Sequence, residues 1–302
     1  MSERHLALVG PTASGKSALA LDVARRLGDI ELVSADSMQV YRGMDIGTAK
    51  PTEDERAEVP HHLLDVAEPD ERYTVARFQA DVDAAVAEIE ARGHRALLVG
   101  GTGLYVQAVV DGLVLPGEWP EVRAELEFEA AATGTEGLHR RLAVVDPGAA
   151  ARIEPTNKRR VVRALEVTLG SGRPFSSFGP GLGVFPPSRF RLAGVWLGRD
   201  ALSRRIDARL GAQVDAGFLE EAVALAPRLS ATARQALGYK ELLDHADGLC
   251  TLDEAVELAA RRTREFSRRQ RMWFRRDPRI TWLGGGDDPV DLAPVLLGDW
   301  SQ

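Results

Sequence analysis

The octapeptide Gly10-Pro11-Thr12-Ala13-Ser14-Gly15-Lys16-Ser17 constrains the fold of this chain more than any other segment. It matches the pattern G-x-x-x-x-G-K-[ST] of the P-loop, in which backbone N–H groups converge on phosphate oxygens, lysine adds a positive charge and the last hydroxyl can ligate Mg²⁺. A glycine-rich turn with an incidental lysine would share the pattern without the function. The context favours the P-loop, because an apolar strand is predicted over 5–10 and a helix over 16–27.

Strand and helix patterns alternate beyond this motif. Strands are predicted over 30–35 and 95–99, with a helix over 74–92 between them. This alternation predicts an α/β fold, a P-loop NTPase-like parallel sheet with helices on both faces. The long connection over 36–73 is expected to be functional or disordered.

The middle of the chain has a different pattern. After 104–112, Pro116-Gly117 and Trp119-Pro120 open a stretch of helical composition, and strand character returns only at 191–197. We therefore predict a P-loop α/β core formed by 1–115 and 190–302, with a helical insertion domain at 116–189.

One long helix is predicted over 251–276, followed by a last strand over 279–283. Thr251 and Glu254 have capping-box spacing, and Asp277-Pro278 ends the pattern. The helix side expected to face the core consists of Val256, Ala259, Phe266 and Trp273.

Composition excludes several classes of protein. A net charge of −7 argues against indiscriminate coating of nucleic acid, and a single cysteine, Cys250, excludes a disulfide framework or a Cys-rich zinc site. Every apolar run is far shorter than the roughly 20 residues that span a bilayer, and the N-terminus lacks a secretory signal pattern. We expect a cytoplasmic protein that does not interact with membranes.

Two further residues are predicted to share the site with the P-loop. Asp36 follows the second strand, and Thr102 follows the third in Gly100-Gly101-Thr102-Gly103. In a doubly wound sheet the carboxyl ends of neighbouring strands border one crevice, so these residues should converge on one substrate. Asp36 could instead be a turn or cap residue, and Thr102 a plain turn residue.

The P-loop alone leaves ATPases, GTPases and small-molecule kinases open. A GTPase would need Asn-Lys-x-Asp, whereas Asn157-Lys158 continues with two arginines, and the strand over 95–99 ends in glycines without the acid of a motor or transport ATPase. An ATP-dependent small-molecule kinase, which would bind a nucleotide, remains the alternative enzyme class.

Basic clusters suggest RNA as a partner. Arginines and a lysine crowd 152–163, and nine arginines fall between Arg261 and Arg279, interleaved with aromatic residues. Arginine pairs with phosphates and stacks on bases, so a structured RNA is a candidate ligand, whereas solvated helix faces are the alternative. An RNA-binding module with a degenerate nucleotide site is therefore a third possibility. For His61-His62 with Asp65, a structural role is favoured over a metal site.

Several segments together resemble one family, the tRNA dimethylallyltransferases (tRNA isopentenyltransferases). The chain shows no zinc-finger extension of the eukaryotic members, so it resembles the bacterial type. The likeness runs nearly end to end, and its segments are the P-loop, Asp36 to Tyr41, Gly43 to Pro51, Pro60 to Asp65, Gly100 to Tyr105, Arg160 to Glu166, Gly238 to Glu241 and Thr263 to Arg275.

The resemblance implies a prenyltransferase that moves a dimethylallyl group from its diphosphate to the exocyclic amine of the adenosine 3′ of the anticodon. It implies that Gly10 to Ser17 hold the diphosphate with Mg²⁺ on Ser17, that Asp36 is the general base and that Thr102 positions substrate. The partners would be the prenyl diphosphate and the tRNA anticodon arm, bound by a monomer. The implied tRNA contacts are Asp36, Ser37, Met38, Gln39, Thr102, Arg123, Arg159, Arg160, Val161, Val162 and Arg163.

One position departs from some relatives. They carry an arginine, expected to touch phosphate, where this chain has Gln235 before Gly238-Tyr239. The resemblance therefore does not extend to a diphosphate contact at this position.

Overall fold

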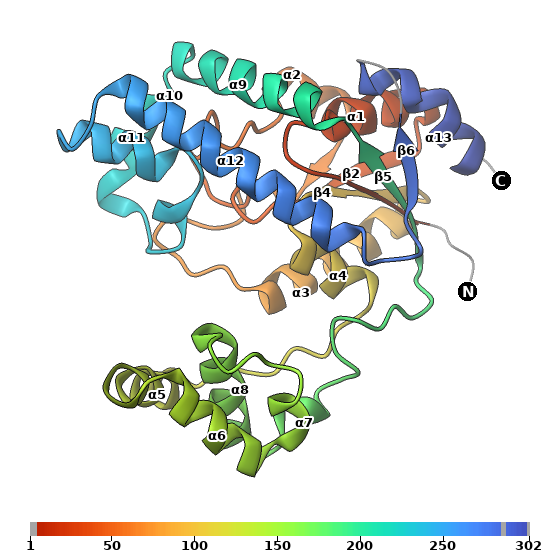
Figure 1. The fold of residues 1–302 in the computed structure, drawn as a ribbon. Helices are drawn as coiled ribbons and strands as arrows, with labels where there is room; N and C mark the ends of the chain where they lie inside the picture. The colour runs from red at the N-terminus through yellow and green to blue at the C-terminus, as the bar shows by residue number, and fades with distance from the viewer. Residues whose placement is uncertain (1–4, 285–287, 301–302) are drawn as a thin grey trace. The chain divides into compact units, whose positions relative to one another are not determined.

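The structure, a computed structural model, describes residues 5–284 and 288–300. The chain divides into two compact units, shown in Figure 1. The core unit comprises Met1–Asp111 and Pro186–Gln302, and the helical unit comprises Gly112–Phe185. The boundaries predicted at 116 and 190 each lie four residues further along the chain than the observed 112 and 186.

A six-stranded sheet in the order β3-β2-β4-β1-β5-β6 forms the centre of the core unit, and every pairing in it is parallel. The predicted α/β class is therefore confirmed. The two-residue edge strand β3 was not predicted, because so short a segment has no periodicity. The strands are β1 (His5–Val9), β2 (Ile30–Ala35), β3 (His61–His62), β4 (Arg95–Gly100), β5 (Phe190–Trp196) and β6 (Thr281–Gly284).

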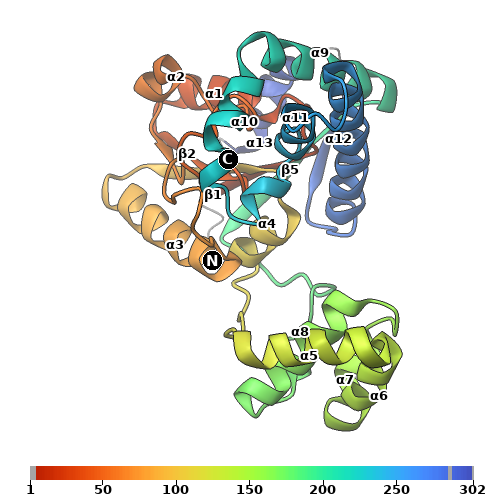
Figure 2. The same ribbon diagram turned by 90° about the vertical axis from the view of Figure 1, so that its left-hand side faces the viewer.

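Helices cover both faces of this sheet (Figures 1 and 2). One apolar cluster packs α1 and α13 on one face, and a second cluster packs α3, α4, α11 and α12 on the other. The helices of the core unit are α1 (Lys16–Leu27), α2 (Glu53–Glu58), α3 (Val75–Ala91), α4 (Gly103–Val110), α9 (Arg199–Asp215), α10 (Phe218–Leu225), α11 (Tyr239–Ala246), α12 (Leu252–Phe274) and α13 (Ala293–Trp300).

The long helix α12 begins as predicted, and its buried face overlaps the predicted one. Thr251 and Glu254 form the capping box, with the Thr251 hydroxyl accepting from the Glu254 N–H at 3.2 Å. Ala259 is buried in the core cluster, and Val256 and Trp273 pack against it, as predicted, whereas Phe266 is half-buried and lies outside that cluster, so its assignment to the core was wrong. The fully buried positions carry mainly small or polar side chains, namely Ala255, Ala259, Ala260, Thr263, Ser267, Gln270 and Phe274.

Because α12 lies close to the sheet, its buried positions carry mainly small rather than large side chains. A Cβ placed on Gly103, the first residue of α4, would lie 2.4 Å from the ring of Trp273, and one on Gly101, just after β4, would lie 2.4 Å from Gln270 Nε2, so α12 is already in contact with both places. Large side chains on the buried face would push the helix away.

The helical unit consists of α5 (Pro120–Thr133), α6 (Thr135–Val145), α7 (Pro147–Ala150) and α8 (Lys158–Ser171), and contains no strand within its fully described span of residues 112–185. Its apolar residues form a core of their own, in which Leu138, Leu142 and Leu165 are completely buried. The unit therefore has the internal packing of a small helical domain.

An ionic cluster at the amino-terminal end of β2 accounts for the histidine pair. The buried Glu31 carboxylate accepts from Arg92 at 2.8 and 2.7 Å and contacts ring nitrogens of His62 at 2.7 Å and His94 at 2.9 Å. The structural role favoured for His61-His62 is confirmed. Among the described residues, no group of three or more His, Cys, Asp or Glu could hold a metal ion.

The Glu31 cluster should make folding stability depend on acid pH. Hydrogen bonds from Arg92, His62 and His94 lower the pKa of Glu31 from 4.5 to about 2. The unfolded state then binds the proton more tightly, so this contribution is complete above the unfolded pKa and is lost as pH falls from about 5 to about 2. Urea unfolding should show that Glu31→Gln lowers the free energy of unfolding at pH 7 and that the difference from the unmodified chain shrinks towards pH 2.

Glu257→Gln is the matched control, because Glu257 is exposed on α12. It should leave both the stability and its pH profile nearly unchanged. A Glu31→Gln difference that stayed constant from pH 7 to pH 2 would contradict the assignment.

Candidate active site

The parallel register brings three strand ends side by side. Val9 of β1 and Ala35 of β2 both align with Gly100 of β4. The next residues along each strand are the start of the P-loop, Asp36 and the Gly101-Thr102 turn. A Cβ on Gly100 would lie 2.2 Å from the Ala35 carbonyl oxygen, so only glycine permits this approach. The structure thus places the predicted residues along one edge of the sheet.

The P-loop has the backbone of an anion-binding turn. It connects β1 to α1, with Gly15 at a φ of 83° and Ala13 at 61°, both in the left-handed region. Among the described residues, the buried Ser14 hydroxyl has no hydrogen-bond partner. A buried polar group without a partner is costly, and a phosphate oxygen would satisfy it. The incidental-turn alternative does not account for this orphaned hydroxyl at the N-terminus of a twelve-residue helix.

Lys16 has the electrostatic setting of a phosphate ligand. Its Nζ donates to the Pro11 carbonyl at 3.4 Å. Burial lowers the pKa of Lys16 from 10.5 to about 8, while the charge of Asp36 raises it and that of Arg209 lowers it further. An anion bound beside Lys16 would relieve this unfavourable environment.

Arg209 was missed by the sequence analysis. It extends from α9, and its guanidinium donates to the Thr12 hydroxyl at 2.7 Å. Burial also lowers its pKa, while the Asp36 charge raises it. Gln235, in contrast, is exposed. No sequence motif singles out Arg209, because α9 contains several other arginines.

Asp36 is both a turn residue and an available carboxylate. Its Oδ1 accepts from the N–H groups of Met38 at 2.9 Å and Gln39 at 3.4 Å, as in an Asx turn. Within the described part of the chain, Oδ2 has no hydrogen-bond partner. Thr102 lies next to this turn, since its hydroxyl accepts from the Ser37 N–H at 3.3 Å. The turn alternative was therefore right for one oxygen of Asp36, and the other remains free for chemistry.

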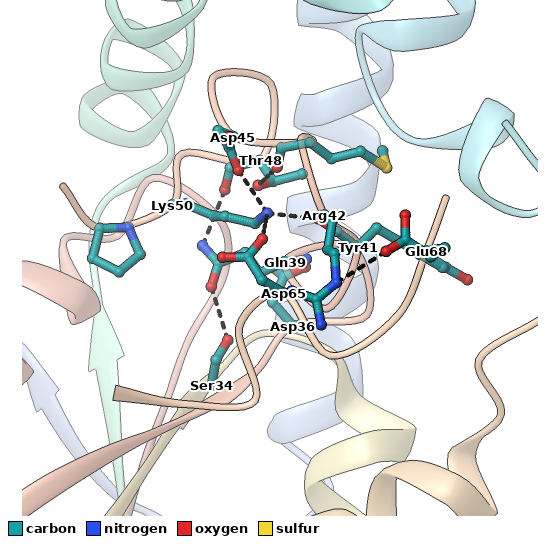
Figure 3. Close-up of polar contacts among 12 residues, drawn as sticks. Ser34, Asp36, Gln39, Tyr41, Arg42, Asp45, Thr48, Lys50, Asp65 and Glu68 are labelled. Carbon is teal, nitrogen blue, oxygen red and sulfur yellow. Dashed lines mark hydrogen bonds and ion pairs between the residues drawn. The ribbon is translucent and has the colours of Figure 1, made fainter. Parts of the chain in front are cut away.

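The segment after Asp36 is ordered by a network that Figure 3 shows. The buried Lys50 ammonium donates to the Tyr41 carbonyl at 2.6 Å, to Asp45 at 2.7 Å and to Asp65 at 2.5 Å. Gln39 accepts from Ser34 at 2.8 Å and donates to the Thr48 carbonyl at 3.1 Å. The predicted tRNA-contact segment is thus held on a folded support.

A carboxylate from α10 closes this support from the other side. Glu221 accepts from the N–H groups of Asp45 at 2.9 Å, Ile46 at 2.7 Å and Gly47 at 3.0 Å, and from the Tyr239 hydroxyl at 2.5 Å. A Cβ on Gly47 would lie 2.2 Å from the Phe218 ring. Within the motif Gly43 to Pro51, position 47 therefore needs glycine for packing, while Gly43 has a φ of 74°, in the left-handed region that favours glycine.

The four arginines of the helical unit that are predicted to contact tRNA fall into two groups. Arg123 and Arg163 bind the fully buried Glu166 at 2.6 and 2.9 Å, and its carboxylate also accepts from the Trp119 N–H at 2.9 Å. The side chains of Arg159 and Arg160 are exposed at the start of α8 and have no ion-pair partner among the described residues.

Val161 and Val162 do not fit side-chain contact with tRNA. Their side chains are 0% and 2% exposed, respectively, and pack in the core of the helical unit. The predicted block is contiguous in sequence, whereas a helix turns only some of its positions outward, and the exposed side chains in it are those of Arg159 and Arg160.

A second basic surface surrounds Trp196 at the carboxyl end of β5. The guanidinium of Arg271 lies 4.0 Å from the Trp196 ring centroid, and that of Arg275 lies 5.8 Å from it. Burial and the like charges of Arg199 and Arg275 lower the pKa of Arg271. Cations held together in this way favour a polyanion as neighbour.

Fold and sequence together define an α/β protein with a parallel sheet whose edge carries the P-loop motif and the Asp36 carboxylate. Comparison with known proteins assigns the family. The family model described as IPP transferase matches residues 39–277, and that described as isopentenyl transferase matches residues 4–68. The chain therefore belongs to the IPP transferase family.

Relatives in other organisms agree over nearly the full length. The tRNA dimethylallyltransferase of Kineococcus radiotolerans is 52% identical, over 97% of this chain and 95% of the relative. That of Geobacter metallireducens is 48% identical, over 93% and 92%.

Solved structures agree as well. The tRNA isopentenylpyrophosphate transferase of Bacillus halodurans matches with a TM-score of 0.70 and 39% identity, over 99% of this chain and 97% of that one. A eukaryotic dimethylallyltransferase acting on tRNA has a TM-score of 0.79 at 24% identity, over 98% and 77%. The latter likeness shows the fold alone.

The lowered pKa of Lys16 predicts a pH dependence of anion binding. Lys16 carries its charge below about pH 8 and loses it above, so the affinity for inorganic pyrophosphate should fall as pH rises through that value. Titration calorimetry from about pH 7 to about pH 9.5 would measure this. Pyrophosphate itself titrates, so Lys16→Met supplies the baseline. A ratio of the two affinities that does not change with pH would contradict the assignment of Lys16.

Proposed function

We propose that this chain transfers a dimethylallyl group from dimethylallyl diphosphate to the exocyclic amine of the adenosine 3′ of the anticodon in tRNA. The observation that carries the proposal is the placement of a free carboxylate oxygen, on Asp36, along the sheet edge that holds the P-loop. β4 ends in glycines rather than in the acid expected of a motor or transport ATPase. A phosphate cradle and a base thus stand together without that acid.

The P-loop and its cations are suited to a leaving diphosphate. Negative charge grows on the bridging oxygen as the carbon–oxygen bond breaks, and fixed N–H groups and cations stabilise it. Lys16 supplies one cation, and Arg209 supplies a second at Thr12. The remaining members of the cradle, Gly10, Pro11, Ala13, Ser14, Gly15 and Ser17, contribute backbone groups and hydroxyls.

Mg²⁺ fits this site as a partner of the diphosphate. It prefers hard oxygen ligands and usually keeps several waters, so one hydroxyl and substrate oxygens suffice to hold it. The exposed Ser17 in the first turn of α1 offers that hydroxyl. When bound, the ion would neutralise charge on the departing diphosphate.

Asp36 is the proposed general base. The adenine amine is a weak nucleophile whose proton becomes acidic only as its nitrogen attacks carbon. In the proposed step the bond from nitrogen to the prenyl carbon forms, the bond from that carbon to the diphosphate oxygen breaks, and the amine proton passes to Asp36 Oδ2. Thr102, beside the Asp36 turn, orients the incoming nucleotide.

Recognition of tRNA is assigned to two surfaces. The adenosine must leave its stack to reach the sheet edge, and the turn formed by Ser37, Met38 and Gln39 is suited to receive it. Arg159 and Arg160 are exposed cations suited to the phosphates of the anticodon arm. Arg123 and Arg163 fix Glu166 and hence the fold of the helical unit.

Label transfer tests the function and Asp36 together. With labelled dimethylallyl diphosphate, Mg²⁺ and unmodified tRNA, the unmodified chain should label the tRNA. Asp36→Asn keeps an oxygen for the turn but removes the base, so kcat should fall by about 100-fold or more while the Kd for tRNA changes little.

Asp54→Asn, which alters an exposed acid on α2, is the control and should retain full turnover. Near-normal turnover by Asp36→Asn would remove Asp36 from the chemistry. An unlabelled tRNA together with ATP-dependent phosphorylation of a metabolite would instead support the kinase alternative.

Charge removal on α8 should weaken tRNA binding. Replacing both Arg159 and Arg160 with alanine should reduce affinity and lower the slope of log K against log salt by about one unit for each lost phosphate contact. Filter binding at several salt concentrations measures both. Arg140→Ala, an exposed arginine of α6, is the control, and an unchanged slope in the double variant would return Arg159 and Arg160 to a solvated face.

A further inference from the structure

A buried glutamine of α12 joins two strand ends of the site. Gln270 is 6% exposed. Its Oε1 accepts from the Thr12 N–H at 2.8 Å, and its Nε2 donates to the Gly101 carbonyl at 2.9 Å. One side-chain amide thus connects the P-loop after β1 with the turn after β4 that carries Thr102.

The Gln270 amide lies in close contact with the backbone of Gly101. A Cβ on Gly101 would lie 2.4 Å from Gln270 Nε2 and 3.0 Å from the Gly10 carbonyl oxygen. The two strand ends and the helix therefore meet at a point where a side chain on Gly101 is not tolerated. The glutamine side chain reaches both backbone groups, and its amide supplies an acceptor for the Thr12 N–H and a donor for the Gly101 carbonyl.

Thr12 is held from a second direction by Arg209. Gln270 binds its backbone N–H from α12, and Arg209 binds its hydroxyl from α9. The Ser14 N–H is bonded within the loop, to the Pro11 carbonyl at 3.3 Å. Thr12 is therefore the residue through which both helices fix the conformation of the P-loop.

We propose that Gln270 is a positioning residue that keeps the P-loop in register with Thr102 and Asp36. The inference rests on the proposed function. By fixing Thr12, Gln270 also fixes where Arg209 stands, so it acts on the diphosphate through two other groups and touches no substrate itself. Without it, the prenyl donor would sit out of alignment with the base and the incoming amine.

The test uses Gln270→Met, which keeps the length and apolar volume of the side chain but removes both hydrogen bonds. The affinity for inorganic pyrophosphate with Mg²⁺, measured by calorimetry, should fall about tenfold, as expected for two lost hydrogen bonds. In the transfer assay kcat should fall by at least as much, while the Kd for tRNA stays within about twofold.

A second variant protects the test from simple unfolding. Gln270→Glu keeps the acceptor for Thr12 but sets a carboxylate against the Gly101 carbonyl oxygen, and it should lose the same two activities. Thr263→Val is the control, because Thr263 is equally buried on α12 and its hydroxyl binds only the Ala259 carbonyl of its own helix. It should lower the melting temperature without changing pyrophosphate affinity or kcat.

The outcomes separate the two proposals. If the unmodified chain binds pyrophosphate and labels tRNA, but the Gln270 variants match it in affinity and kcat, the positioning role is wrong. The same holds if Thr263→Val reproduces their losses, since any packing defect would then suffice. A chain that neither binds pyrophosphate nor labels tRNA overturns the proposed function itself, and the inference with it.

Discussion

The parallel alignment of Val9, Gly100 and Ala35 is the constraint on which the site depends. Three strands must end at the same level for the P-loop, Asp36 and Thr102 to share one edge. Gly100 makes this possible, because any side chain there would collide with the Ala35 carbonyl. The helices that follow, α1 and α4, start from these ends, and α12 packs directly against them. Displacing one strand end would therefore disturb every functional group at once.

The cations along this edge lie in an environment that disfavours their charge. Lys16 and Arg209 both have their pKa values lowered by burial, and both interact with the charge of Asp36. Elsewhere the protein pairs its buried charges with several partners, as at Glu31, Lys50 and Glu166. Incomplete neutralisation at the P-loop is costly to folding and is what a diphosphate would relieve.

Local sequence predicted the parts of the site that local geometry determines. The P-loop, Asp36 and Thr102 each follow a strand, and the sheet rule for strand ends was enough to bring them together. Arg209 and Gln270 could not be found in this way, because they reach Thr12 from 197 and 258 positions away in the chain. The burial of the Val161 and Val162 side chains could not be predicted for a different reason: a contiguous motif does not reveal which side of a helix is buried.

The carboxylate of Glu221 has a consequence for motion. A long connection between a strand and a helix normally opens easily, since few of its backbone groups are paired. Here three successive amides, of Asp45, Ile46 and Gly47, are held by one side chain from α10, which is also bound by Tyr239. Their protons are released for exchange with solvent only when the Glu221 side chain leaves them, and the Tyr239 hydroxyl holds that side chain in place. We therefore expect the segment behind the Asp36 turn to exchange more slowly than a loop without such a support.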